Sequence, residues 1–208
     1  MPALKLHPGL ASTSRLGSLQ RPLDDTSTLD WVMLIGVGIV TAIVSTFVNL
    51  HLRVPGHAIL KTVFPVAAGL ALVPRRGAGT VIGASAVLTA IGLRMGGAGG
   101  GGTGMGALTS LFLIGPMLDL ALRRARLSFT VYIGFVLAGL GTNVLALVAR
   151  GTLKSLGLDH GGGRTFSMWF PQAVGTYALC GVAAGLISAF VWFCVRPTKS
   201  ERSRENLS

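Results

Sequence analysis

The stretch WVMLIGVGIVTAIVSTFVNL, residues 31–50, indicates the fold class of this chain. It contains 20 consecutive residues without a charge, and a helix needs about 20 apolar residues to cross the hydrocarbon core of a bilayer. A second uncharged stretch, residues 165–195, is longer still. Only 12% of the 208 residues are charged, about half the share found in soluble domains. We therefore expect a polytopic membrane protein.

Six apolar segments, among them residues 31–50, fit membrane-spanning helices. They cover residues 31–50, 57–74, 77–94, 105–122, 128–149 and 169–195. We predict an all-α bundle of about six transmembrane helices at residues 31–195, with a polar N-terminal tail at 1–30 and a basic C-terminal tail at 196–208. The N-terminal 30 residues lack an apolar core, so we expect the first span to act as an uncleaved anchor.

The formal net charge is +11, and the placement of the basic residues indicates membrane topology rather than nucleic-acid binding. If the segments between spans alternate between two sides, one side receives both tails and the segments around Arg75 and Arg123. That side carries 12 of the 18 Lys and Arg residues. The positive-inside rule then predicts a multi-pass protein of the cell (inner) membrane with both termini in the cytoplasm. We expect the lipid bilayer, including its anionic headgroups, as a partner.

Two further patterns concern packing within the bundle. Small residues recur at four-residue spacing, which allows helix backbones to approach closely: Gly79 and Gly83, Gly134 and Ala138, Gly181 and Gly185. Asp119 lies four residues before Arg123, and this spacing predicts a structural ion pair near the end of a span.

The segment between the first two spans is the first candidate site. It contains Asn49, His51 and His57, with a Pro55-Gly56 turn directly before His57. An imidazole at a membrane boundary is costly unless it is solvated, paired or bound to a ligand. Each histidine taken singly fits an interfacial or hydrogen-bonding role as well as a ligand role, so both interpretations stay open.

The segment between the third and fourth spans, residues 96–106, is mostly glycine. Each glycine costs a helix up to about 1 kcal/mol relative to alanine, so the segment is predicted to be a loop or a re-entrant segment. No Gly-Lys-Ser/Thr follows, so it is no P-loop. Gly100, Gly102 and Met105 would form a lid over a site; the alternative is a flexible external loop.

The third segment on this side contains Asp159 and His160. Three of the four histidines thus fall on the side predicted to face outward, and neutral imidazole suits Co, Ni, Cu and Zn. The candidate ligands for a substrate or metal are His57, His51, Asn49 and His160. No serine, histidine and acid can be grouped at one membrane depth, so we expect no catalytic residues and no enzyme activity.

Three motifs in order resemble a known family: VPGH at residues 54–57, LVPRRGAG at 72–79, and the Gly-rich segment leading into GMGA at 104–107. They resemble the cobalt- and nickel-uptake membrane subunits of energy-coupling-factor (ECF) transporters over about residues 31–125. Those subunits hold their metal largely with an N-terminal Met-His-Ile-Pro segment and the Gly-His histidine. This chain begins Met1-Pro2-Ala3, so only His57 is carried over, and the chain is more generally similar to ECF substrate-binding subunits.

This resemblance implies an integral membrane substrate-binding subunit of an ECF-type uptake transporter. It would capture a divalent metal ion such as Co or Ni, or another small solute, at its outer face, with no covalently bound cofactor. A coupling membrane subunit and ABC ATPases would be its partners, because the chain has no nucleotide-binding motif. The alternative is a non-transporting membrane protein that serves as a structural or accessory subunit of a larger complex.

Overall fold

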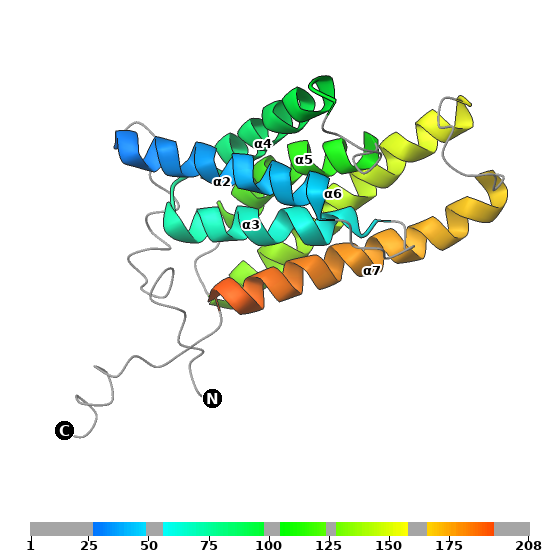
Figure 1. The fold of residues 1–208 in the computed structure, drawn as a ribbon. Helices are drawn as coiled ribbons and strands as arrows, with labels where there is room; N and C mark the ends of the chain where they lie inside the picture. Colours follow the sequence, from blue (N-terminus) through cyan, green and yellow to red (C-terminus); the bar gives the residue numbers. More distant parts are fainter. Residues whose placement is uncertain (1–26, 49–55, 98–104, 124–127, 158–165, 194–208) are drawn as a thin grey trace.

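The computed structural model describes residues 27–48, 56–97, 105–123, 128–157 and 166–193. These residues form six helices: α2 (Thr28–Phe47), α3 (Ala58–Leu72), α4 (Ala78–Met95), α5 (Met105–Leu122), α6 (Ser128–Ser155) and α7 (Phe166–Phe193). The helices pack into one all-α bundle (Figure 1). The prediction of a six-helix bundle is confirmed.

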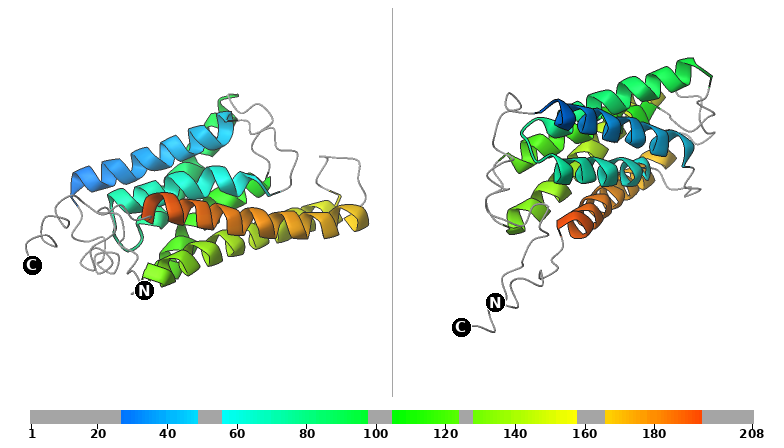
Figure 2. Two further views of the ribbon diagram at one scale, coloured as in Figure 1. Left: turned by 90° about the horizontal axis from the view of Figure 1, so that it is seen from below. Right: turned by 60° about the vertical axis from the view of Figure 1, so that its left-hand side comes forward.

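Four of the described helices, α2, α4, α6 and α7, are long and apolar enough to cross a membrane, and α3 and α5 are shorter apolar helices. The protein is therefore a plausible polytopic membrane protein. At 28 residues each, α6 and α7 are about 42 Å long, against a hydrocarbon thickness of about 30 Å. Together they extend beyond the other helices at one end of the bundle (Figure 2).

The short helix α3 lies at the centre of the bundle, because it contacts each of the five other helices. The other helices contact one another in the order α2, α4, α5, α6 and α7 and form an arc around it. The buried residues of α3 share one broad face, which spans about 160° at 100° per residue: Ile59, Thr62, Val63, Val66, Ala67, Gly69 and Leu70. The exposed residues Phe64 and Leu72 lie on the opposite face.

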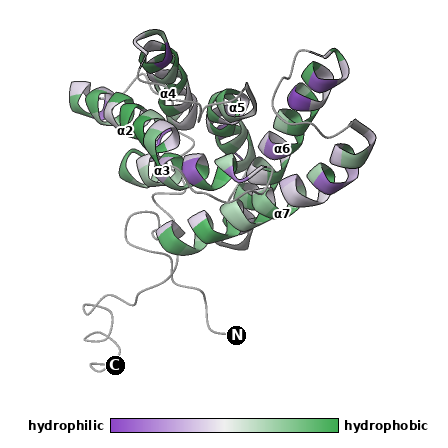
Figure 3. Ribbon diagram, turned by 45° about the vertical axis from the view of Figure 1, so that its right-hand side comes forward, coloured by the Kyte–Doolittle hydropathy of each residue, from purple (hydrophilic) through white to green (hydrophobic). Residues whose placement is uncertain are grey.

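Successive helices run in alternating directions, so the bundle has two ends (Figure 1). At one end, which we call the His57 end, α2 ends, α3 begins and the α6–α7 pair extends. At the other, the Arg75 end, α2 begins, the turn between α3 and α4 carries Arg75 and Arg76, and α7 ends. Hydrophilic residues are concentrated where α6 and α7 extend beyond the bundle (Figure 3).

Helix α2 begins at Thr28, three residues earlier than hydropathy predicted, because a capping box precedes it. The Ser27 hydroxyl accepts a hydrogen bond from the Asp30 backbone N–H at 3.2 Å, and the Asp30 carboxylate accepts one from the Ser27 N–H at 3.3 Å. This reciprocal pair satisfies two backbone donors at the start of the helix.

Glycines allow the closest helix contacts, as their spacing predicted. A Cβ added to Gly79 of α4 would lie 2.7 Å from the carbonyl oxygen of Gly115 on α5, and one added to Gly181 of α7 would lie 2.8 Å from that of Gly139 on α6. Both distances are shorter than real Cβ atoms adopt. These two helix pairs therefore pack backbone against backbone, as membrane helices often do.

The predicted ion pair of Asp119 with Arg123 is wrong. The Asp119 carboxylate instead accepts hydrogen bonds from the backbone N–H of Gly79 (3.1 Å) and Thr80 (2.7 Å) and from the Thr80 hydroxyl (2.6 Å). Arg123 is exposed, and no ion pair joins the two within the described residues. The N–H groups at the start of a helix lack partners in their own helix and carry partial positive charge. The start of α4 is therefore a better partner for the Asp119 carboxylate than the exposed Arg123 side chain.

Candidate functional site

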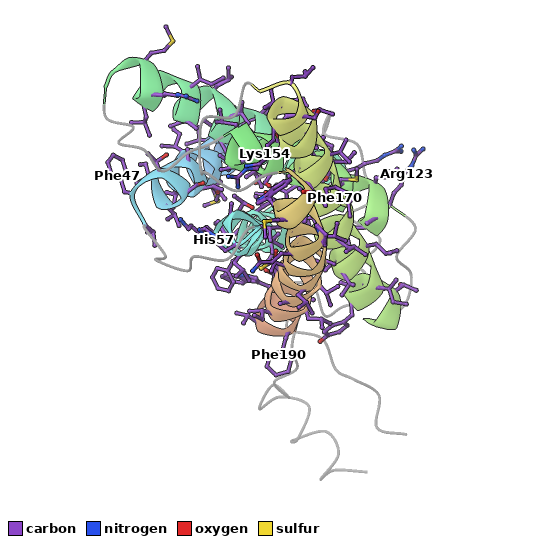
Figure 4. The ribbon with its side chains drawn as sticks, turned by 90° about the vertical axis from the view of Figure 1, so that its right-hand side faces the viewer. Phe47, His57, Arg123, Lys154, Phe170 and Phe190 are labelled. Atoms are coloured by element: carbon purple, nitrogen blue, oxygen red, sulfur yellow. The ribbon has the colours of Figure 1, made fainter. Side chains whose placement is uncertain are left out.

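His57 lies immediately before α3, so the central helix places it at the middle of the His57 end (Figure 4). The preceding Gly56 has φ +86°, a left-handed conformation that favours glycine. The turn is closed by the backbone: the Gly56 carbonyl accepts from the Ile59 N–H at 3.5 Å and the His57 carbonyl from the Leu60 N–H at 3.1 Å. The half-buried imidazole does not cap its own helix.

Asn143 of α6 ties this turn to the rest of the bundle. Its side-chain nitrogen donates to the Tyr177 carbonyl of α7 at 2.7 Å and to the Gly56 carbonyl at 3.3 Å. Both partners are acceptors only, so they fix which side of the amide is nitrogen. One side chain thus connects the start of α3 with the middle of α6 and α7.

Gly56 also packs directly against Tyr177. A Cβ added to Gly56 would lie 3.0 Å from both Cα and Cγ of Tyr177. Tyr177 is buried in a small apolar cluster between α6 and α7. The turn before His57 is therefore held on two sides, by a hydrogen bond from α6 and by steric contact with α7.

The interior near the His57 end is polar. All the buried polar side chains of the described residues except Ser188 lie in the halves of their helices nearer this end: Thr41, Ser45, Thr46, Thr62, Ser110, Thr142 and Asn143. Three of their oxygens have no hydrogen-bond partner among the described residues, namely Oδ1 of Asn143 and Oγ1 of Thr46 and Thr142. A buried polar group without a partner costs about 1–3 kcal/mol, and such groups call for an explanation beyond packing.

Lys61 lies one turn beyond His57 and reaches back to α2. Its ammonium donates a hydrogen bond to the carbonyl oxygen of Val48 at the end of α2. This carbonyl belongs to the terminal turn of a helix, where backbone acceptors lack intrahelical partners and carry partial negative charge. The first turn of α3 is thereby joined to α2 as well, beside the candidate site.

The extended α6–α7 pair carries a second group of chemical interest. The guanidinium of Arg150 lies 5.7 Å from the ring centroid of Trp169, and the ammonium of Lys154 lies 5.5 Å from it. Both are within the range of cation–π attraction. Trp169 belongs to the same apolar cluster as Tyr177, so this group continues from the candidate site along the α6–α7 pair.

No family model, curated protein or solved structure matches this chain. The resemblance to cobalt- and nickel-uptake subunits thus stays a prediction.

Among the predicted site residues, His57 is the one whose side chain the structure describes. Asn49, His51, His160, Gly100 and Gly102 lie outside the described residues. Met105, predicted to belong to a lid, is the first residue of α5. Within the described ranges no three His, Cys, Asp or Glu side chains gather as a metal site would require. The metal prediction thus concerns His57 together with residues beyond those described.

Asn143 and Tyr177 were not predicted as site residues. The sequence did contain a signal for Asn143, because a carboxamide within the apolar run of α6 is the kind of intramembrane polar residue that marks functional sites. Tyr177 gave no such signal, since its role depends on a backbone carbonyl and on close contact with a glycine in another helix.

Proposed function

We propose that this protein is the integral membrane substrate-binding subunit of an ECF-like uptake system. It captures a divalent metal ion of the cobalt or nickel type, or another small polar solute, at the His57 end. The observation that carries this proposal is the fixed Gly56–His57 turn at the centre of that end, tied by Asn143 to α6 and α7. This attachment holds the backbone of the turn, and with it His57, in one position relative to α6 and α7.

The chemistry near His57 supports capture of a polar solute. Neutral imidazole is a ligand for divalent cobalt and nickel. The interior behind it offers amide and hydroxyl oxygens, some of them without partners. Polar groups placed in an otherwise apolar bundle are a common feature of substrate sites in membrane proteins.

The proposed orientation follows from charge. The segments that connectivity places at the Arg75 end carry 12 of the 18 basic residues of the sequence. By the positive-inside rule this end faces the cytoplasm, and the His57 end faces outward, where a solute would be captured. Partner subunits would supply ATP hydrolysis and coupling, and they would meet this protein within the membrane or at its cytoplasmic face.

Metal titration of the purified full-length protein tests the proposal. Co²⁺, Ni²⁺ and Zn²⁺ are titrated against the wild type, His57→Ala and His7→Ala. His7 is a matched control, because it is the same residue type in the tail predicted to lie on the opposite side. We expect high-affinity binding by the wild type and His7→Ala, and loss of at least about tenfold in affinity in His57→Ala, equivalent to about 1.4 kcal/mol.

Three other outcomes of these measurements would contradict parts of the proposal. If the wild type binds none of the three ions, capture of a metal is wrong. If water-soluble vitamins also leave its thermal midpoint unchanged, the substrate-binding function is wrong, and the role of an accessory subunit replaces it. If His57→Ala binds as tightly as the wild type, the metal site lies elsewhere.

A further inference from the structure

We infer that Asn143 is the positioning residue for His57: it holds the Gly56–His57 turn in the orientation in which the imidazole binds the solute. This inference rests on the proposed function, because it assigns a role within the same site. It concerns a residue 87 positions away in sequence from the turn that it holds.

The direction of the Asn143 amide is fixed by its two partners. Its nitrogen faces two carbonyl oxygens, of Gly56 and Tyr177, and a reversed amide would bring its oxygen against two acceptors. The nitrogen therefore connects the turn to α7 through these two hydrogen bonds. The imidazole belongs to His57, the residue directly after Gly56. The backbone that carries the imidazole is therefore fixed relative to α6 and α7.

This arrangement is poor for stability alone. The amide oxygen of Asn143 is buried and has no partner in the part of the chain that the structure describes, whereas an apolar side chain of similar size would leave no such group. The two carbonyls do not depend on Asn143 either. Gly56 also accepts from the Ile59 N–H at 3.5 Å, and Tyr177 lies within α7, where the residue four positions later donates to it.

Tyr177 of α7 restrains the turn from its other side. Gly56 has a positive φ and lies against Tyr177 with no space for a Cβ. The hydrogen bond from Asn143 and this contact act on the same residue from two helices. Together they remove the freedom of the turn just before His57, which is what a ligand-bearing turn needs for preorganised binding.

The experiment uses Co²⁺ alone as probe, because its visible absorption reports the number and geometry of its ligands. The full-length protein in detergent is compared with Asn143→Leu and with Ser188→Ala. Ser188 is the control, since it is a buried polar residue of the bundle that lies near the end of α7 remote from His57. Thermal midpoint, Co²⁺ affinity and the absorption spectrum are measured on each.

For Asn143→Leu we expect a thermal midpoint within a few degrees of the wild type, Co²⁺ affinity lower by about tenfold or more, and an altered absorption spectrum. For Ser188→Ala we expect wild-type affinity and spectrum. A merely structural role would give the reverse, with a lower midpoint and an unchanged spectrum. Asn143→Ser is a second variant, because its short hydroxyl cannot reach Gly56 and can bond within its own helix.

The outcomes separate the two proposals. Wild-type affinity and spectrum in folded Asn143→Leu or Asn143→Ser, together with weakened binding in His57→Ala, overturn the role of Asn143 and leave the proposed function intact. If both Asn143 variants fail to fold, the residue is structural and the inference is wrong. If the wild type binds no Co²⁺, the proposed metal capture fails, and the positioning role fails with it.

Discussion

Asp119 of α5 caps α4 through Thr80, whose backbone N–H and hydroxyl both donate to the same carboxylate oxygen, at 2.7 and 2.6 Å. The two residues are 39 positions apart. This contact fixes the start of one apolar helix against the end of another at the Arg75 end. It also explains how a carboxylate is accommodated in a short apolar helix, since within the described residues its partners are the N–H groups and a hydroxyl of α4.

Replacement of Asp119 by Ala is expected to lower the free energy of unfolding by about 2–3 kcal/mol, because hydrogen bonds to charged groups are strong and the Gly79 N–H that would lose its acceptor belongs to a buried residue. Thermal unfolding in detergent measures the change. Arg123→Ala is the control and should have little effect, since Arg123 is exposed. Equal destabilisation by the two variants would restore the ion pair as the main interaction.

Replacement of Gly181 by Ala is expected to separate α6 from α7 and to lower the thermal midpoint, because the added Cβ would meet the Gly139 carbonyl oxygen at 2.8 Å. Gly175→Ala in the same helix has nothing within 4 Å of its Cβ. It should be neutral or stabilising by up to about 1 kcal/mol through helix propensity. Similar midpoints for the two variants would contradict the close packing of α6 and α7.

Replacement of Trp192 by Phe is expected to cost about 1 kcal/mol, a typical value for one hydrogen bond. The indole N–H donates to the Phe64 carbonyl at 3.1 Å, while the two rings lie 5.4 Å apart and would remain in contact. Trp31→Phe, at the exposed start of α2, should have almost no effect. A larger loss in Trp31→Phe would show that these indoles act mainly as interfacial anchors.

The proposed topology predicts opposite labelling of Arg76→Cys and Met95→Cys, made in a background in which Cys180 and Cys194 are replaced by Ala. Both positions are exposed and lie at opposite ends of α4. A membrane-impermeant thiol reagent added to intact cells should label Met95→Cys and leave Arg76→Cys unlabelled until the membrane is opened. The reverse pattern would invert the orientation, and labelling of both would remove α4 as a span.

The sequence was sufficient for the number and order of the helices, because charge-free runs and Gly- or Pro-containing breaks mark them directly. It failed at helix ends where something other than hydropathy decides. Helix α2 starts at the Ser27–Asp30 capping box, and α6 continues six residues beyond its predicted end to Ser155. Those last residues of α6 include Arg150 and Lys154, and hydropathy detects only the part of a helix that matches the bilayer.

The candidate site was predicted only in part for a similar reason. His57 follows a Pro-Gly turn between two apolar runs, and this local pattern was visible in the sequence. The contact of Asn143 with Gly56 depends on how α3 and α6 pack, which no local spacing encodes. Asp119 illustrates the same point. Its spacing in the sequence predicted an ion pair with Arg123, whereas the structure pairs it with the N–H groups of Gly79 and Thr80 on α4.

The hydrogen bonds of Asn143 also have a consequence for biosynthesis. When α6 leaves the ribosome, Gly56 has already been made, but Tyr177 in α7 has not. The hydrogen bond from Asn143 to the Tyr177 carbonyl, at 2.7 Å, therefore forms only after α7 enters the membrane. Until then α6 carries a carboxamide that is incompletely paired, which is costly in hydrocarbon. We expect α6 and α7 to insert as a hairpin, and chains released before α7 to be recognised as unfinished by membrane quality control.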